Sequence, residues 1–313
     1  MDKARVVVVV NKWWECDPVM NVLLHEKAIP KELKWPATLN HPRHRPPNKN
    51  SGRRPRAVFD LEHSTVEVWC LSDLLEKVDQ DHQFSSESKA ALLPLVRAKK
   101  AALTIALGTA GHPDACTHNG CVVIGTKVFM HNFHPNGSNP LSNWTVGPFD
   151  EVVGSTLSQP VFESMVDFEH QVVVDIGKRL LPTPLNPAHP PMIMADYHHA
   201  ALGAVNVTNY DEYPQSDAAT LKAYHTLYGK AGAQSLETTH GLIRVHGSDN
   251  FIFISGISDR VGYFDEEANS RSYGQNTVAA HNAGIALAWM LPRIDAVAPS
   301  LNVSRKDAKA QMK

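Results

Sequence analysis

The stretch FIFISGISDR, residues 251–260, decides the fold. Its first four residues are apolar without polar alternation, which is typical of a strand covered on both faces, as in a parallel sheet. We expect the chain to turn after Ile254, through Ser255 and Gly256, and to place the carboxylate of Asp259 beyond the strand's carboxyl end. Ligands of open α/β sheets bind there, because the connecting loops diverge and leave a crevice. The stretch therefore predicts a parallel sheet with an acidic group at a binding crevice.

The rest of the chain alternates between similar strands and helices. RVVVVVN (5–11) and AALTIALGTAG (101–111) also predict strands buried on both faces. Helices are expected over residues 18–29 with Pro18 at the start, and over 86–100, 155–181, 217–229 and 275–292. The alternation predicts an α/β protein, a three-layer α/β/α sandwich around a mixed, largely parallel sheet.

Two proline-rich stretches interrupt this pattern. Residues 30–56 are rich in prolines and basic residues, and we expect no regular structure there. A second stretch covers residues 182–191. Strands that resemble core strands occur on both sides of each, so residues 1–313 are expected to form a single domain with a basic, proline-rich loop insertion at about residues 30–56.

The composition argues against several classes of protein. A net charge of −2 gives no overall attraction to nucleic acid or to a membrane. No apolar stretch approaches the roughly 20 residues of a membrane span. The four cysteines show no CxxC spacing, which favours reduced thiols in a cytoplasmic protein over a metal site. We therefore expect a cytoplasmic protein with no nucleic-acid or membrane partner and no metal.

Four short motifs occur in a meaningful order. FISGISD (253–259) resembles the strand-to-loop segment of purine-cleaving members of the nucleoside phosphorylase and nucleosidase superfamily, in which a Ser-Asp pair meets the purine. SLETTHG (235–241) resembles the Glu-Met-Glu segment of that family, and ALGTAG (106–111) resembles its Gly-Ser/Thr-x-Gly turn. VVVVVNKWWE (6–15) resembles its first strand and the following loop. TVAAHNAGIAL (277–287) also resembles the last helix of that family, and the order and rough spacing of all these segments hold from about residue 5 to residue 292.

The resemblance implies roles in purine and sugar binding. Asp259 would protonate or hydrogen-bond the purine N7, and Ser258 would help to hold the purine edge. Glu237 would accept hydrogen bonds from the sugar hydroxyls, with Leu236 in place of the family's methionine. Tyr210 would lie against the base. For Glu237, the plain alternative is an acid at a helix end.

The nucleophile decides the reaction. The resemblance implies that Glu15 activates water and that Thr109 places a hydroxyl nearby, although Glu15 also suits the start of a helix. Hexameric phosphorylases carry arginines at two places that are Met20 and Ala106 here, so hydrolysis is favoured. Phosphorolysis stays open, with phosphate as co-substrate and a phosphate-binding arginine from the basic loop: Arg53, Arg54 or Arg56. A nucleoside-binding protein without turnover is the third alternative. The resemblance also implies a homo-oligomer with no cofactor.

Overall fold

The computed structural model describes residues 3–25, 37–39, 54–75, 85–113, 118–132, 152–166, 179–185, 187–205, 213–229, 232–263 and 273–311. Its strands are β1 (Ala4–Val10), β2 (Ala37–Leu39), β3 (Ala57–Asp60), β4 (Ser64–Cys70), β5 (Leu103–His112), β6 (Val122–Gly125), β7 (Lys127–Asn132), β8 (Val152–Val153), β9 (Ile193–Ala195), β10 (Ala200–Val205), β11 (Ala233–Glu237) and β12 (Phe251–Arg260). Its helices are α1 (Trp13–His25), α2 (Ser86–Val96), α3 (Gln159–Val166), α5 (Tyr213–Ala223), α6 (His240–His246) and α7 (Tyr273–Gln311).

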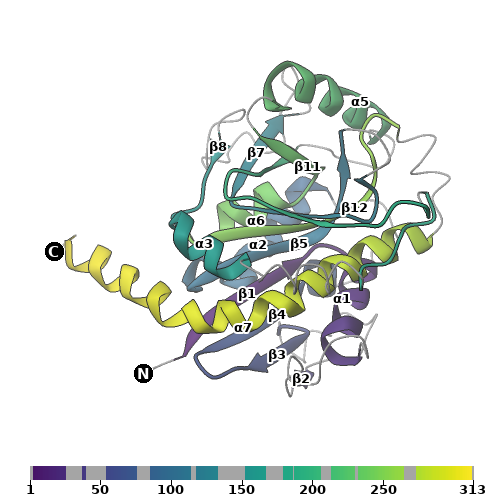
Figure 1. The fold of residues 1–313 in the computed structure, drawn as a ribbon. Helices are drawn as coiled ribbons and strands as arrows, with labels where there is room; N and C mark the ends of the chain where they lie inside the picture. The colour runs from purple at the N-terminus through teal and green to yellow at the C-terminus, as the bar shows by residue number, and fades with distance from the viewer. Residues whose placement is uncertain are drawn as a thin grey trace.

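The twelve strands in the described residues join one sheet (Figure 1). β4, β1, β5 and β12 pair in parallel, and so do β11, β10 and β7. A single antiparallel bridge, between Leu236 of β11 and Gly111 of β5, connects the two groups. The remaining antiparallel pairs lie around this frame and include β2 with β3 and β12 with β6. The predicted mixed, largely parallel sheet is confirmed. A single domain with a basic insertion stays a prediction.

The valines of β1 show why helices cover both faces. Val6, Val8 and Val10 pack in one core with side chains of α1, α3 and α7. Val7 and Val9 point to the other face and pack in a second core with α2 and α6. All five are fully buried. A run of apolar residues without alternation therefore corresponds to a strand between two helical layers.

The predicted turn after Ile254 is wrong. β12 continues to Arg260, with a register shift between Ile257 and Asp259 against β5. Gly256 is needed for packing, because a Cβ there would overlap the carbonyl oxygen of Ala279 in α7. The glycine lets α7 and β12 approach closely. Asp259 is the second-last residue of β12.

Three helix predictions need correction. α1 begins at Trp13, five residues before Pro18, because Glu15 caps the new start. α3 covers only eight of the residues expected between 155 and 181, among those described there. α7 continues past residue 292 to Gln311. The extension of α7 follows from an apolar face that continues at i, i+4 and i+7 through the buried residues Ile294, Ala298 and Leu301.

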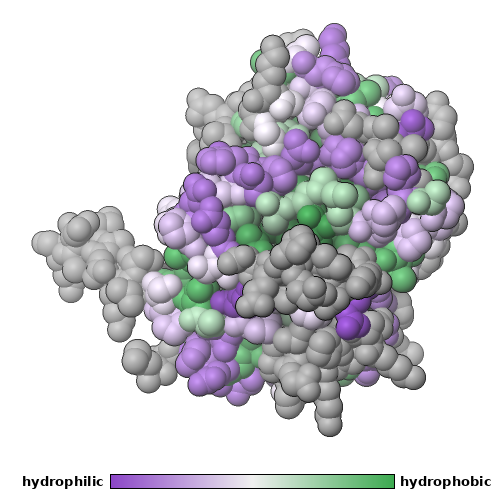
Figure 2. Space-filling model, viewed as in Figure 1, coloured by the Kyte–Doolittle hydropathy of each residue, from purple (hydrophilic) through white to green (hydrophobic). Residues whose placement is uncertain are grey.

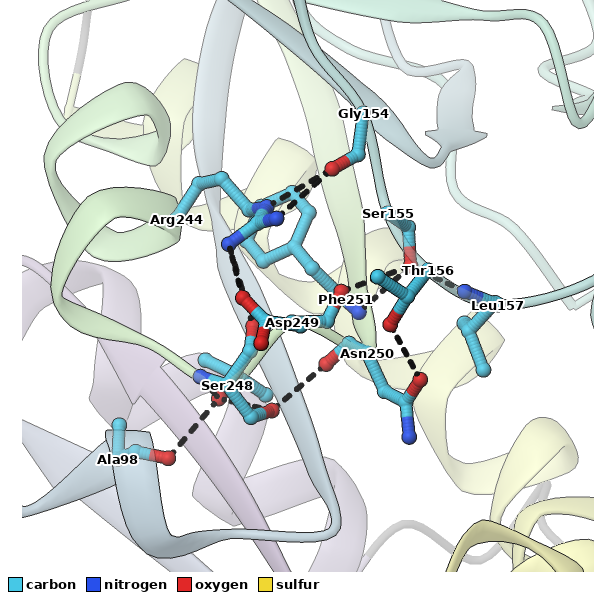
Figure 3. A network of polar contacts seen from close by, with 11 residues as sticks. Ala98, Gly154, Ser155, Thr156, Leu157, Arg244, Ser248, Asp249, Asn250 and Phe251 are labelled. Carbon is cyan, nitrogen blue, oxygen red and sulfur yellow. Dashed lines mark hydrogen bonds and ion pairs between the residues drawn. The ribbon is translucent and has the colours of Figure 1, made fainter. Parts of the chain in front are cut away.

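Polar contacts hold residues 154–157 against the amino end of β12 (Figure 3). Arg244 of α6 donates to the carbonyl oxygen of Gly154, with 2.8 Å from Nη2, and its Nη1 lies 3.7 Å from Asp249. The hydroxyl of Ser155 accepts a hydrogen bond of 2.8 Å from the backbone N–H of Phe251. These contacts explain why the segment is extended and not helical. The carboxyl end of β12, with Ser258 and Asp259, faces a cavity instead.

The basic insertion is described only in part, and two expectations about it are wrong. Residues Ala37–Leu39 form β2 and pair with β3, although no regular structure was expected there. Arg56 is 3% exposed, and its Nε and Nη2 pair with both oxygens of Asp73 at 2.8 and 2.6 Å. Its Nη1 pairs with Asp17. Arg56 therefore ties the end of the insertion to the core and does not reach out to a ligand.

The surface and the cysteines add two observations. Cys16, Cys70 and Cys121 are free and buried, and burial raises the pKa of the Cys70 thiol. Large apolar side chains are exposed at Leu185 and Met192, and Figure 2 shows an apolar band across the middle of the view. No helix in the described part of the chain has both the length and the apolar character to cross a lipid bilayer.

Candidate active site

A cavity of about 200 Å³ lies where β1, β5, β11 and β12 end. All four strands contribute polar groups at or near these ends, where helices no longer cover the side chains. The α5 helix closes another side. The cavity is lined by Asn11, Lys12, Trp14, Glu15, Leu107, Gly108, Thr109, Ala110, Gly111, Ser216, Asp217, Thr220, Leu236, Glu237, Thr238, Thr239, His240, Ile243, Ser258, Asp259 and Val261.

Three hydrogen bonds fix the carboxylate of Glu15. Its Oε2 accepts from the backbone N–H of Lys12 at 2.9 Å, which caps the start of α1. Its Oε1 accepts from the backbone N–H and from the hydroxyl of Thr109, both at 2.8 Å. Glu15 is 4% exposed. The carboxylate therefore spans from the first helix to the end of β5 and lies in the cavity wall.

Glu237 ends β11 with one satisfied and one unsatisfied oxygen. Its Oε2 accepts from the backbone N–H of Thr239 and, at 2.7 Å, from that of His240, so it caps α6. Its Oε1 is buried and has no hydrogen-bond partner among the described residues. An unpaired buried carboxylate oxygen is costly, so this atom is suited to donors that a ligand brings. Leu236 lies beside it in the cavity wall.

Asp259 lies at the end of β12 and is 9% exposed. Its Oδ1 accepts a hydrogen bond from the hydroxyl of Ser258. The side-chain amide of Gln275, from α7, donates to the carbonyl oxygen of Ser258. The carboxyl group is thus held at the cavity by its neighbour in the strand and, through that neighbour, by α7.

Two lysines bring positive charge to this region. Lys12 lines the cavity, while Lys89 of α2 lies behind the wall, 1% exposed, and donates to the hydroxyl of Thr238 at 2.8 Å. Burial lowers the pKa of Lys89 to about 7. The charge of Lys12 lowers this pKa further, whereas Glu237 and Glu15 oppose the shift. The cavity thus contains acids on its wall and a buried lysine close behind them.

Comparison with known proteins gives structural matches only. No protein-family model and no curated protein matches the sequence. An S-adenosylhomocysteine nucleosidase from Streptococcus pyogenes superposes with a TM-score of 0.51 at 11% identity, over 93% of this chain and 97% of that chain. The futalosine hydrolase of Helicobacter pylori gives 0.52 at 7% identity, over 92% and 97%. A methylthioadenosine phosphorylase from an antarctic soil metagenomic library gives 0.51 at 10% identity, over 94% and 87%.

The chain has the fold that these nucleosidase, hydrolase and phosphorylase structures share. The fold expected from the motifs is confirmed. The nucleosidase, the hydrolase and the phosphorylase all share this fold, so the fold alone does not distinguish the two reactions.

Six of the seven predicted site residues line the cavity: Glu15, Thr109, Leu236, Glu237, Ser258 and Asp259. Tyr210 lies outside the described residues. Their roles stay predictions. Met20 and Ala106 were expected at phosphate-binding positions, and this expectation is wrong. Both side chains are buried in the two cores and do not line the cavity.

Several lining residues were not among the predicted site residues, and four of them carry polar side chains from α5 and α6. Ser216, Asp217 and Thr220 come from α5, and His240 begins α6. The i, i+4 spacing of Ser216 and Thr220, both buried, was a possible signal for an inward polar face. His240 follows Glu237 by one helical turn. Among the described residues, no group of three histidines, cysteines or acids is arranged to hold a metal ion.

Proposed function

We propose that this protein cleaves the N-glycosidic bond of a purine nucleoside or a related nucleoside by hydrolysis. The observation that carries hydrolysis is the contact between Glu15 and Thr109. The N–H and the hydroxyl of Thr109 are donors that suit a phosphate anion, and here a carboxylate of the protein accepts from both. A phosphate dianion would have to displace that carboxylate and lie beside its negative charge. Water has no such conflict.

The reaction uses two acids of the cavity wall, Glu15 and Asp259. Water attacks the anomeric carbon of the sugar and gives its proton to Glu15, so that a C–O bond forms. The C–N bond to the base breaks, and its electron pair goes to the purine. Asp259 delivers a proton to the purine N7, which relieves the departing base of negative charge. Free base and free sugar result, and both acids then exchange protons with solvent.

Glu237 supports a sugar as the ligand between these groups. Its unpaired Oε1 accepts from a sugar hydroxyl, while Oε2 stays bonded to the backbone of α6. The cap at Oε2 keeps the carboxylate from rotating away, which lowers the cost of ordering it when the ligand binds. Ser258 and Leu236 would contact the base and the sugar. The nucleosidase and the hydrolase with the same fold support N-glycoside cleavage in general.

Phosphorolysis is the second candidate, and two observations favour it. A phosphorylase shares the fold, and Lys12 brings a cation to the cavity next to Glu15. No arginine lines the cavity among the residues that the structure describes. A single lysine is a weaker anion site than several charge-assisted donors, since arginine can bind two phosphate oxygens at once.

The test is a panel of purine nucleosides, including methylthioadenosine, incubated with the protein in phosphate-free buffer and in millimolar phosphate. We expect free base and free sugar without phosphate, at a rate that phosphate does not raise. Strict dependence on phosphate with a sugar 1-phosphate as product would reverse the choice between hydrolysis and phosphorolysis. Saturable binding of nucleosides without any base release would favour the alternative of a binding protein without turnover.

A further inference from the structure

His240 lies in the cavity between the two acids that the proposed reaction assigns to sugar and water. It is the first residue of α6 and is 2% exposed. The Glu237 cap fixes its backbone through the 2.7 Å bond from its N–H to Oε2. Its ring packs against Phe253 with centroids 5.9 Å apart. The imidazole is therefore confined on both its backbone and its ring side.

A relay of hydroxyls reaches Nδ1 of this ring. Ser255 Oγ lies 3.3 Å from Nδ1 and 3.0 Å from Ser235 Oγ, and both serines are fully buried. When Ser235 donates to Ser255 and Ser255 donates to Nδ1, the imidazole carries its proton on Nε2. Glu237 Oε1 is 4.0 Å from Nδ1, beyond hydrogen-bond distance. With the relay running in this direction, Nε2–H is a hydrogen-bond donor.

Nε2 faces the same space as the carboxylate of Glu15. A Cβ on Gly108 would lie 3.6 Å from Nε2 and 3.0 Å from Glu15 Oε1. The glycine leaves that space open to the cavity, and Nε2 makes no hydrogen bond to any described residue. One donor and one acceptor therefore converge on a position that a single oxygen atom can reach.

We propose that His240 binds the attacking water together with Glu15. Nε2–H donates to one lone pair of the water, and Glu15 accepts one of its protons. The second lone pair is then directed at the anomeric carbon, and the C–O bond forms as the proton moves to Glu15. The imidazole gains and loses no proton in this step, so its contribution is the position of the water. This inference rests on the proposed hydrolysis.

The experiment compares His240→Leu, His240→Gln and His246→Leu with the wild type on whichever nucleoside of the panel is cleaved fastest. Leucine removes the donor, and the amide nitrogen of glutamine occupies nearly the position of Nε2. His246 is a partly buried histidine of the same helix outside the cavity, so its variant measures the purely structural cost. Thermal unfolding followed by circular dichroism reports that cost for all three.

We expect kcat to fall roughly 10- to 100-fold in His240→Leu, with KM within about threefold of the wild type, because a misplaced reactant affects the rate more than nucleoside binding. His240→Gln should recover most of the loss, and His246→Leu should keep the wild-type kcat. In dilute methanol, the ratio of methyl glycoside to free sugar should rise for His240→Leu, a change that a merely structural role would not produce.

An unchanged kcat in His240→Leu, or an equal loss in His246→Leu, overturns the assignment while base release by the wild type keeps the proposed function. A loss confined to KM overturns it too and makes His240 a sugar-binding residue. If the wild type releases no base, or releases it only with phosphate, the proposed hydrolysis itself is wrong and the inference fails with it.

Discussion

Replacing Lys89 with methionine should change how the stability of the protein depends on pH. Lys89 is 1% exposed, and its ammonium donates to the hydroxyl of Thr238. Burial lowers its pKa from 10.5 to about 7. Between these two values the unfolded chain holds a proton that the folded chain has released. The contribution of Lys89 to the free energy of unfolding therefore rises with pH across this window and is smallest below about pH 7.

The size of the effect follows from the same two pKa values. One pKa unit of difference between the folded and unfolded states corresponds to about 1.4 kcal/mol. Linkage then gives a rise of roughly 3 kcal/mol between about pH 6.5 and about pH 9.5, which disappears when the side chain cannot titrate. Lys89→Met keeps the length of the side chain without the charge. It should be the more stable protein at the acidic end of the window and should lose this advantage toward the alkaline end.

Urea unfolding followed by circular dichroism, repeated at several pH values, measures this difference. Lys222→Met is the control, because Lys222 is exposed on α5 and should show no pH-dependent difference from the wild type. A wild-type minus Lys89→Met difference that stays constant within about 0.5 kcal/mol across the range would mean that Lys89 is solvated in the folded state, and the reasoning from burial would be refuted.

Three further predictions concern catalysis, folding and assembly. Asp259→Asn should cut kcat by about 10²–10⁴-fold with little change in thermal midpoint, since it removes a positioned proton donor; cleavage at the wild-type rate would exclude Asp259 as the acid. Arg56→Ala should lower the free energy of unfolding in urea by about 3–5 kcal/mol, because it removes both hydrogen bonds from Arg56 to the buried carboxylate of Asp73. Arg54→Ala, at an exposed position, should lower it by less than about 0.5 kcal/mol. The chain should form a homo-oligomer through exposed apolar surface that includes Leu185, and sedimentation velocity at micromolar concentration showing only monomer would contradict this.

The residues at strand ends were accessible from the sequence. Five consecutive valines identify a strand that is buried on both faces, and the polar residues that follow such a strand must lie at an edge of the sheet. The same reasoning pointed to Thr109, which lies in the last part of β5, and to Asp259 near the end of β12. These positions depend on local sequence, because the strand itself brings them to the cavity.

Features that depend on contacts between distant segments were not accessible. Gly256 resembles a turn residue in the sequence, and only the approach of Ala279 explains it. Met20 matched a phosphate-binding position by order along the chain, yet its side chain packs in the core. The inward face of α5, with Ser216 and Thr220, is selected by how the helix docks on the sheet. Short motifs specify order, while side-chain direction is set by packing.

Glu15 belongs at the same time to the first helix and to the cavity wall, because its carboxylate bonds both Lys12 and Thr109. In a library that replaces every residue, Glu15 should therefore be sensitive in a selection for abundance as well as in one for activity, whereas Asp259 should be sensitive for activity alone. Residues such as Glu15, which serve both folding and activity, tolerate few substitutions. A substitution there that improves activity also lowers the amount of folded protein, and a second change must restore it. New specificities in this chain should therefore arise more readily on the wall formed by α5 than beside Glu15.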